Sequence, residues 1–202
     1  MTIRVGLTGG VATGKSTVAR LLAGQGAVII DADALAREVV AKGTAGLEQV
    51  RAEFGAELIG PDGELDRPAM GRLVFGDSQA RKRLEAIVHP LVFQRIVELE
   101  EKAAVDAVVV HDIPLLAESG RAGTFDAVIV VDAPTELQLQ RMLSERGWTQ
   151  EDAGSRIAAQ ATREDRLNIA THVIENTGTR EDLRTRVAEV YADVVSAGSR
   201  NG

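Results

Sequence analysis

One short stretch, GGVATGKS over Gly9–Ser16, limits what this chain can fold into. An apolar run, Ile3–Leu7, precedes it, and an amphipathic segment, Lys15–Ala23, follows it. The stretch fits the pattern G-x-x-x-x-G-K-[ST], in which glycines let backbone N–H groups wrap around an anion. The start of the following helix adds unpaired N–H groups and the positive end of its dipole. Strand, loop and helix in this order predict a phosphate-binding loop at the edge of a parallel sheet.

Short β-branched runs alternate along the chain with longer helical stretches, which indicates an α/β fold with helices on both faces of a parallel sheet. The expected strands are continuously apolar, as strands buried on both faces are, and cover Ile3–Leu7, Val28–Ile30, Ala107–His111, Ala127–Val131 and His172–Ile174. The expected helices cover Lys15–Ala23, Ala34–Ala41, Gly46–Phe54, Pro68–Phe75, Ser78–Lys102, Glu136–Ser144, Gln150–Ala161 and Arg180–Ser196. We therefore expect a P-loop NTPase-type sheet.

One long stretch interrupts this alternation. About 75 residues without a strand signal separate the second and third expected strands, far more than a crossover helix needs. They predict a helical insertion over 34–104, with a turn at Gly60–Gly63. The insertion lies within a single domain, 1–202, whose nucleotide-binding core is 1–33 and 105–202. The segment Gln138–Arg166 is rich in arginine, and its part 138–163 is expected to form a lid. The tail Ser196–Gly202 is expected to be disordered.

The composition excludes several classes of protein. The net charge of −7 disfavours a nucleic-acid partner, because a phosphate backbone is bound by surplus Lys and Arg. The chain has no cysteine, which excludes disulfides, thiolate metal sites and cysteine nucleophiles. No apolar run approaches the roughly 20 residues of a membrane span, and the first residues lack a signal-peptide pattern. We expect a cytoplasmic protein with small-molecule partners, and no feature predicts its oligomeric state.

The loop predicts a nucleoside triphosphate, ATP or GTP, bound with Mg²⁺. Lys15 can reach the β- and γ-phosphates, and the Ser16 hydroxyl is a magnesium ligand. A carboxylate should end a neighbouring strand, where Asp112 and Asp132 both qualify, unless either merely closes its strand. We prefer Asp112 because Glu118 follows it and adds a second carboxylate at the same edge. The predicted nucleotide-binding residues of the loop are Gly10, Val11, Ala12, Thr13, Gly14, Lys15, Ser16 and Thr17.

Two carboxylates, Asp31 and Asp33, follow the second expected strand at the edge where α/β sheets bind ligands. One of them could accept the proton of a hydroxyl that attacks the γ-phosphate, a contribution of about 10²–10⁴-fold. Helix capping is the alternative for either, and Arg37 is well placed for an ion pair with Asp33. We favour a catalytic role for Asp33 and leave capping equally open for Asp31.

The arginine-rich segment offers Arg141, Arg146, Arg156, Arg163 and Arg166 without a lysine. Arginines that fold over a transferring phosphoryl group neutralise the charge on its oxygens. Arg156 and Arg163 are seven residues apart, and in one helix they would share a face. Acidic residues interleave with them, so a solvated, salt-bridged helix face is the alternative for any single arginine.

The order of these motifs resembles the dephospho-CoA kinase family over nearly the whole chain. The matching pieces are Gly6–Gly10 with Gly14–Thr17, Ile30–Asp33 with Ala36 and Arg37, Leu84 and Glu85, Ile87–Pro90, Asp112–Leu116 with Glu118, Val130–Asp132, Gln138 with Arg141, Arg156–Gln160, and Val173–Asn176. A P-loop alone is common. Asp-Ala-Asp with Ala-Arg, His-Pro and Pro-Leu-Leu at these intervals is far more specific.

The resemblance implies that ATP donates its γ-phosphate to the ribose 3′-hydroxyl of dephospho-CoA, giving CoA and ADP. It implies that Asp33 is the general base, that Lys15 and Arg141 stabilise the phosphate, and that Asn176 lies at the adenine. The insertion then corresponds to the CoA-binding part and Gln138–Arg163 to the lid. The expected contacts to the acceptor are Asp33, Arg37, His89, Pro90 and Glu118. Without the resemblance, His89 would be read as a capping or core histidine and Pro90 as a first helical residue.

The chain departs from the family pattern at three places. Ala12 stands where the family usually has glycine, which is tolerable if φ at this position stays negative. Ser119 stands where asparagine is common, and Ala170–His172 replaces the usual acidic residue before the last strand. None of these changes touches Lys15, and they bear on specificity more than on chemistry.

Two other functions stay open at this point. A P-loop kinase for a nucleoside monophosphate or a sugar acid would share the loop and the lid, but it gives no reason for the long insertion with His89 and Pro90. A P-loop ATPase switch would transfer phosphate only to water.

Overall fold

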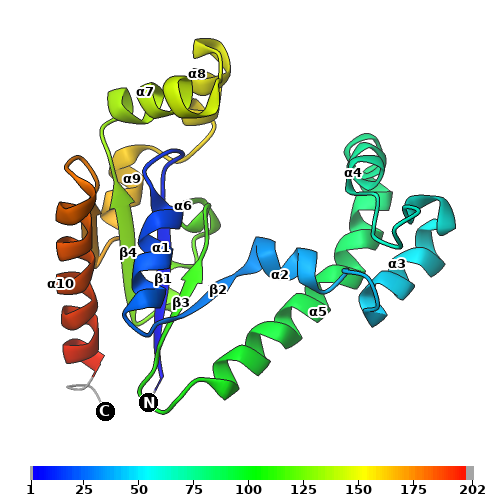
Figure 1. Ribbon diagram of the computed structural model, residues 1–202, viewed down its shortest axis with the longest axis horizontal. Helices are drawn as coiled ribbons and strands as arrows, with labels where there is room; N and C mark the ends of the chain where they lie inside the picture. The colour runs from blue at the N-terminus through cyan, green and yellow to red at the C-terminus, as the bar shows by residue number, and fades with distance from the viewer. Residues whose placement is uncertain (1, 199–202) are drawn as a thin grey trace. The chain divides into compact units, whose positions relative to one another are not determined.

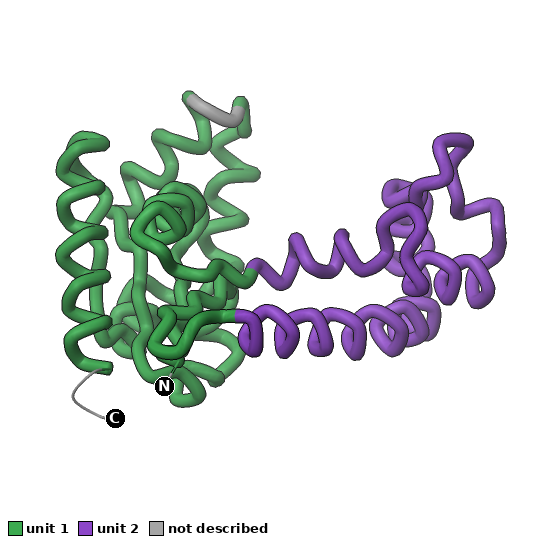
Figure 2. Tube along the Cα trace, turned by 60° about the horizontal axis from the view of Figure 1, so that its bottom comes forward, with its two compact units in different colours: residues 1–30, 103–202 green, residues 31–102 purple. Residues whose placement is uncertain are grey.

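The computed structural model describes residues 2–198 of the chain, which divides into two compact units, Met1–Ile30 with Ala103–Gly202 and Asp31–Lys102 (Figure 2). The strands are β1 (Ile3–Gly9), β2 (Val28–Asp31), β3 (Val108–Asp112), β4 (Ala127–Asp132) and β5 (His172–Glu175). The helices of the first unit are α1 (Lys15–Gly24), α6 (Leu116–Ser119), α7 (Thr135–Arg146), α8 (Gln150–Ala158), α9 (Arg163–Asn168) and α10 (Arg180–Gly198), with a 3₁₀ turn at Ala122–Thr124.

The five strands form one sheet in the order β2-β3-β1-β4-β5, and the pairs β1–β3, β1–β4 and β4–β5 are parallel. Every residue of β3 and β4 is buried, as continuously apolar parallel strands require. The register pairs Leu7 with Asp112 and Gly9 with Val131. The loop after β1 and the carboxylate that ends β3 therefore lie at the same edge of the sheet, and all five expected strands are confirmed.

Helices cover both faces of the sheet, as expected (Figure 1). Apolar side chains of α1 and α10, such as Leu22 and Val187, join Val5 and Ile129 of the sheet in one buried cluster. On the other face, Leu116 of α6 and Leu167 of α9 pack with Val128 and Val130 of β4. Burial on both faces is the main source of stability in such a sheet.

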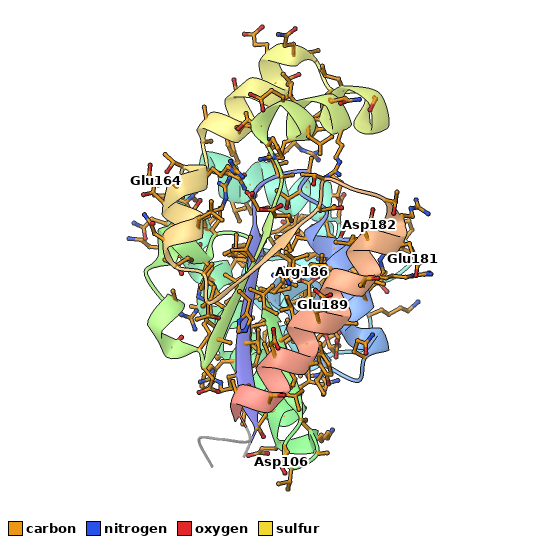
Figure 3. All side chains as sticks on the ribbon, turned by 90° about the vertical axis from the view of Figure 1, so that its left-hand side faces the viewer. Asp106, Glu164, Glu181, Asp182, Arg186 and Glu189 are labelled. Atoms are coloured by element: carbon orange, nitrogen blue, oxygen red, sulfur yellow. The ribbon has the colours of Figure 1, made fainter. Side chains whose placement is uncertain are left out.

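Helix α10 has one buried apolar face and one exposed charged face. Its buried residues are Leu183, Val187, Val190 and Val194, spaced three or four apart as one helical face. The opposite side is charged, and Arg186 and Glu189 form an exposed ion pair at 3.1 Å (Figure 3). Asp182 and Thr179 hydrogen-bond to each other at the start of the helix.

The second unit is helical, with α2 (Ala32–Glu38), α3 (Ala45–Phe54), a 3₁₀ turn at Ala56–Leu58, α4 (Arg67–Gly76) and α5 (Ser78–Lys102). Its own core contains Val40, Leu47, Val50, Leu58, Leu65 and Met70. The expected turn is present, because the N–H of Gly63 donates to the carbonyl of Gly60 at 2.9 Å. The bounds of this unit differ from the expected 34–104 by two or three residues.

Several sequence-based expectations are wrong in detail. Helices α6 and α9 were not predicted, and α8 ends at Ala158, so Arg156 and Arg163 do not share a helix face. The expected helix Ser78–Lys102 coincides with α5, and Pro90 lies inside it, so the alternative interpretation of Pro90 as a first helical residue is wrong. The expected disordered tail is helical through Gly198, and its remainder, 199–202, lies outside the described residues. Within the described part of the chain, no helix has the length and apolar character of a membrane span.

Candidate active site

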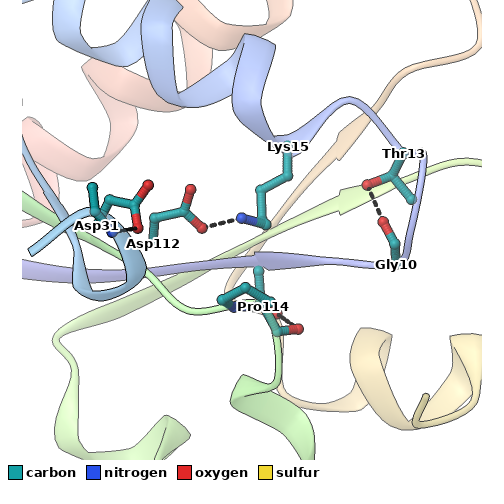
Figure 4. A network of polar contacts seen from close by, with 8 residues as sticks. Gly10, Thr13, Lys15, Asp31, Asp112 and Pro114 are labelled. Carbon is teal, nitrogen blue, oxygen red and sulfur yellow. Dashed lines mark hydrogen bonds and ion pairs between the residues drawn. The ribbon is translucent and has the colours of Figure 1, made fainter. Parts of the chain in front are cut away.

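The phosphate loop is folded by its own short hydrogen bonds. The backbone N–H and the Oγ1 of Thr13 both donate to the carbonyl of Gly10, at 3.2 and 2.8 Å, and Thr13 is almost fully buried (Figure 4). Gly14 precedes α1 with a φ of +94° and offers no side-chain cap. The first N–H groups of α1 are therefore free to bind an anion, which is the property that the motif predicts.

Ala12 corrects one expectation. Its φ is +58°, in the left-handed region, so the condition under which the methyl group would be tolerable, a negative φ, is not met. For an alanine this conformation costs roughly 1–2 kcal/mol. The loop therefore keeps a glycine-like backbone conformation at this position, and the methyl group of Ala12 makes that conformation less favourable.

Lys15 and Asp112 form an ion pair at the sheet edge (Figure 4). Both side chains are largely buried, with exposed fractions of 18% for Lys15 and 10% for Asp112. The ammonium group is thereby held above the end of β3, next to the loop. The phosphate-loop motif predicts Lys15 and Ser16, and a strand end predicts Asp112. The fold brings Lys15 and Asp112 into contact.

Asp132, the other candidate for a metal ligand, is already engaged. Arg163 of α9 donates to both of its carboxylate oxygens, at 2.6 to 3.1 Å, and this interaction raises the pKa of Arg163. Among the described residues, only Oδ1 of Asp112 is engaged, by Lys15, whereas both oxygens of Asp132 are occupied, so Asp112 is the better candidate. No group of three or more His, Asp or Glu side chains within the described ranges could hold a metal ion by itself.

A cavity of about 290 Å³ opens on one side of Gly14 and is lined by Arg141 and Asn176, among others. Asn176 directly follows β5, and its Nδ2 donates to the carbonyl of Thr13 at 2.8 Å. A Cβ at Gly14 would collide with this Nδ2, so only glycine fits beneath Asn176. Asn176 therefore braces the loop and also lines the cavity.

Arg141 of α7 is bound to the loop from the same side. Its guanidinium donates to the carbonyls of Ala12 at 3.2 Å, Thr13 at 3.4 Å and Asn176 at 2.8 Å. It thus lies beside Asn176 in the cavity just described. From the sequence, Arg141 is predicted to be one of the lid arginines that cover a phosphoryl group. Its contact with the loop backbone does not follow from that prediction.

A second cavity, of about 270 Å³, opens on the other side of the loop. Its lining includes Lys15, Ser16, Pro114 and Gln160. The side-chain Oε1 of Gln160 accepts a hydrogen bond from the N–H of Val11 at 2.8 Å. Gln160 ends the matching Arg156–Gln160 piece, and no local sequence pattern predicts a role for it.

The segment that follows Gln160 is fixed by polar contacts. Glu118 of α6 accepts a hydrogen bond from the N–H of Ala161 at 2.7 Å, so one of its carboxylate oxygens is already used. Arg166 is buried, donates to the carbonyl of Ala161, and has its pKa lowered by burial. Thr162 and Asp165 form a capping box that starts α9. These contacts hold the C-terminal end of the expected lid against the core.

The rest of the expected lid, 138–163, consists of α7, α8 and the residues between them. The guanidinium of Arg156 lies over the ring of Trp148, 5.1 Å from its centre. Trp148, Asp152, Ser155 and Arg156 line an open cavity of about 700 Å³. The side chain of Arg146 lies outside the described residues.

Apart from Glu118, the expected acceptor-side residues belong to the second unit. Asp31 caps α2 by accepting the N–H of Ala34 at 2.9 Å (Figure 4), which is the capping role that the sequence left open. Asp33 is exposed in the first turn of α2. Within residues 2–198, its carboxylate forms no hydrogen bond or ion pair, either with Arg37 or with another residue. His89 and Pro90 are exposed on α5, so His89 is not a core histidine.

These features define a nucleotide-binding protein of the P-loop class. The profile of the dephospho-CoA kinase family matches residues 3–182, and the chain belongs to that family. It is 54% identical over 200 residues to a dephospho-CoA kinase of Streptomyces avermitilis, covering 99% of this chain and 98% of the relative. The solved dephospho-CoA kinase from Campylobacter jejuni is 28% identical, with a TM-score of 0.70 and coverage of 98% and 100%.

A more distant solved structure shows only the shared fold. Shikimate kinase from Acinetobacter baumannii is 16% identical, with a TM-score of 0.51, and the alignment covers 97% of this chain and 94% of that one. The members of the dephospho-CoA kinase family are ATP-dependent transferases.

Proposed function

We propose that this protein transfers the γ-phosphate of ATP to the ribose 3′-hydroxyl of dephospho-CoA, giving CoA and ADP. The observation that carries the proposal is the family match over residues 3–182 on a chain whose phosphate loop is intact. The loop N–H groups and Lys15 bind the phosphates. Arg141 and Asn176 border the cavity that we assign to the base and sugar.

The residues at the sheet edge fit Mg²⁺. Ser16 supplies a hydroxyl and Asp112 a largely buried carboxylate beside Lys15, which are oxygen ligands of the kind that Mg²⁺ prefers. When bound, the ion would neutralise charge on the β- and γ-phosphates. Lys15 holds Asp112 by their ion pair and keeps its carboxylate oriented toward the loop.

On the acceptor side we propose Asp33 as the general base for the 3′-hydroxyl. Asp31 is committed to capping α2, which leaves Asp33 as the carboxylate of this pair that is free to accept a proton. The assignments of Arg37, His89, Pro90 and Glu118 to acceptor binding, of 138–163 to a lid and of 34–104 to acceptor binding stay predictions. A cytoplasmic location and the lack of a nucleic-acid partner stay predictions as well.

The test is an assay of ADP formation with dephospho-CoA, AMP, CMP or shikimate as the acceptor, and with no acceptor. We expect ADP to form only with dephospho-CoA. Stimulation by AMP, CMP or shikimate instead would identify another small-molecule kinase. Phosphate release that is independent of any acceptor would identify an ATPase switch.

A further inference from the structure

The two cavities beside the loop define a direction for the bound nucleotide. Both cavities include Ala12, Gly14 and Ser16, and they extend to opposite sides of the loop. The amides at the start of α1 and Lys15 bind the middle of the triphosphate. With the base and sugar beside Asn176, the terminal phosphate reaches the second cavity, which is lined by Lys15, Pro114 and Gln160.

Gln160 is positioned in this second cavity by a bond that fixes its orientation. Its Oε1 accepts the N–H of Val11, so the Nε2 carries both N–H donors of the side chain. In the part of the chain that the structure covers, Nε2 has no hydrogen-bond partner. The backbone on the C-terminal side is held by Glu118 and Arg166 through Ala161. The amide group is therefore preorganised as a donor before a ligand binds.

We propose that Nε2 of Gln160 donates a hydrogen bond to the γ-phosphate of ATP and makes the site distinguish ATP from ADP. The inference rests on the proposed binding of ATP. A donor to a charged oxygen forms a stronger hydrogen bond than a donor to a neutral one. Because ADP lacks the terminal phosphate, it does not gain from this contact. Gln160 is then a substrate-binding residue of the kinase reaction.

Two substitutions separate this role from a purely structural one. Gln160→Ala removes both the bond to Val11 and the donor. Gln160→Glu has the same shape and can still accept the N–H of Val11, but it has no donor and brings a negative charge toward the phosphate. Gln25→Glu is the matched control, since Gln25 is exposed at the C-terminal end of α1 and makes the same change of charge.

The measurement is calorimetric binding of β,γ-imido-ATP and of ADP, each with Mg²⁺ and without an acceptor. We expect Gln160→Ala to weaken imido-ATP binding by roughly 10- to 100-fold and Gln160→Glu to weaken it further, with ADP binding changed by less than about threefold. Gln25→Glu should match the wild type. Thermal melting of each variant checks that the fold is retained.

The outcomes that overturn the inference are specific. If Gln160→Glu bound imido-ATP with the affinity of the wild type, Gln160 would only connect the loop to the segment before α9 through its hydrogen bond with Val11. An equal loss for both nucleotides in Gln160→Ala would show a general distortion of the loop. Neither result depends on dephospho-CoA, so the failure of the proposed acceptor and the failure of this inference are distinguishable.

Discussion

Ala12 holds its backbone at a φ of +58°, in the conformation that glycine adopts most readily. Ala12→Gly should relieve this cost, while the glycine adds some flexibility to the unfolded chain. The expected net result is a rise of roughly 0.5–1 kcal/mol in the free energy of unfolding, with kinase activity retained. Urea unfolding, followed by circular dichroism, measures it.

The control for this prediction is Ala192→Gly, at an exposed position inside α10. There the same change should lower stability by about 0.5–1 kcal/mol, because glycine is unfavourable inside a helix. A lower free energy of unfolding in both variants would contradict the claim that the backbone of Ala12 is strained.

Asp33 and Asp31 provide a second test at the scale of single residues. Asp33→Asn should lower kcat by about 10²–10⁴-fold, because the amide cannot take the proton of the acceptor hydroxyl. The affinity for ATP should change little. Asp31→Asn is the matched control, since asparagine also caps helices and should leave kcat near the wild-type value. Steady-state kinetics with dephospho-CoA measures kcat for both variants. A kcat near the wild-type value for Asp33→Asn as well as for Asp31→Asn would show that Asp33 is not the general base.

Local sequence is enough to assign the loop residues, because a phosphate loop is a continuous motif. Lys15, Ser16 and Asp112 could each be assigned from a motif or a strand end. The bond between Gln160 and Val11 joins residues 149 positions apart, and no local pattern predicts such a pair. The sequence also leaves the φ of Ala12 open, because this angle depends on how the whole loop closes.

At the scale of secondary-structure elements, α10 offers a pH-dependent prediction. The Oγ1 and backbone N–H of Thr179 donate to Asp182 and lower the pKa of its carboxyl below the ordinary 3.8. Because the folded state lowers this pKa, the charged form stabilises α10 above pH 3.8. That stabilisation is lost as the pH falls through the folded-state pKa.

Asp182→Asn keeps a hydrogen-bond acceptor and removes the charge. We expect the variant to be less stable than the wild type near neutral pH, and the difference to shrink as the pH falls below about 4. Urea unfolding at a series of pH values measures the difference. A gap between the two proteins that stays constant with pH would show that the charge of Asp182 does not stabilise the helix.

The strands and the long helices were predictable, whereas the short helices were not. All five strands and the 25-residue α5 follow from apolar runs and helical patterns. Helices α6 and α9 have only four and six residues, too few to show a helical period. The break before α9 was visible in principle, because Thr162 and Asp165 have the spacing of a capping box.

At the scale of the whole molecule, the absence of strand signals predicted that 34–104 would be set apart from the sheet. The structure divides the chain at Asp31 and Lys102, and the residues between them have their own apolar core. Two carboxylates of the predicted chemistry, Asp33 and Asp112, belong to different units. Turnover therefore tests the molecule as a whole, whereas nucleotide binding tests the first unit.

The most direct measurement is ³¹P NMR of the purified protein incubated with ATP, Mg²⁺ and dephospho-CoA. We expect a new phosphomonoester signal that grows in step with ADP and disappears on treatment with a 3′-nucleotidase. Replacing Lys15 by methionine should slow this signal by about 10²-fold or more, because a charge that stabilises the transition state is lost. ADP that appears with inorganic phosphate alone, or with a phosphate at another position of the acceptor, would contradict transfer to the 3′-hydroxyl.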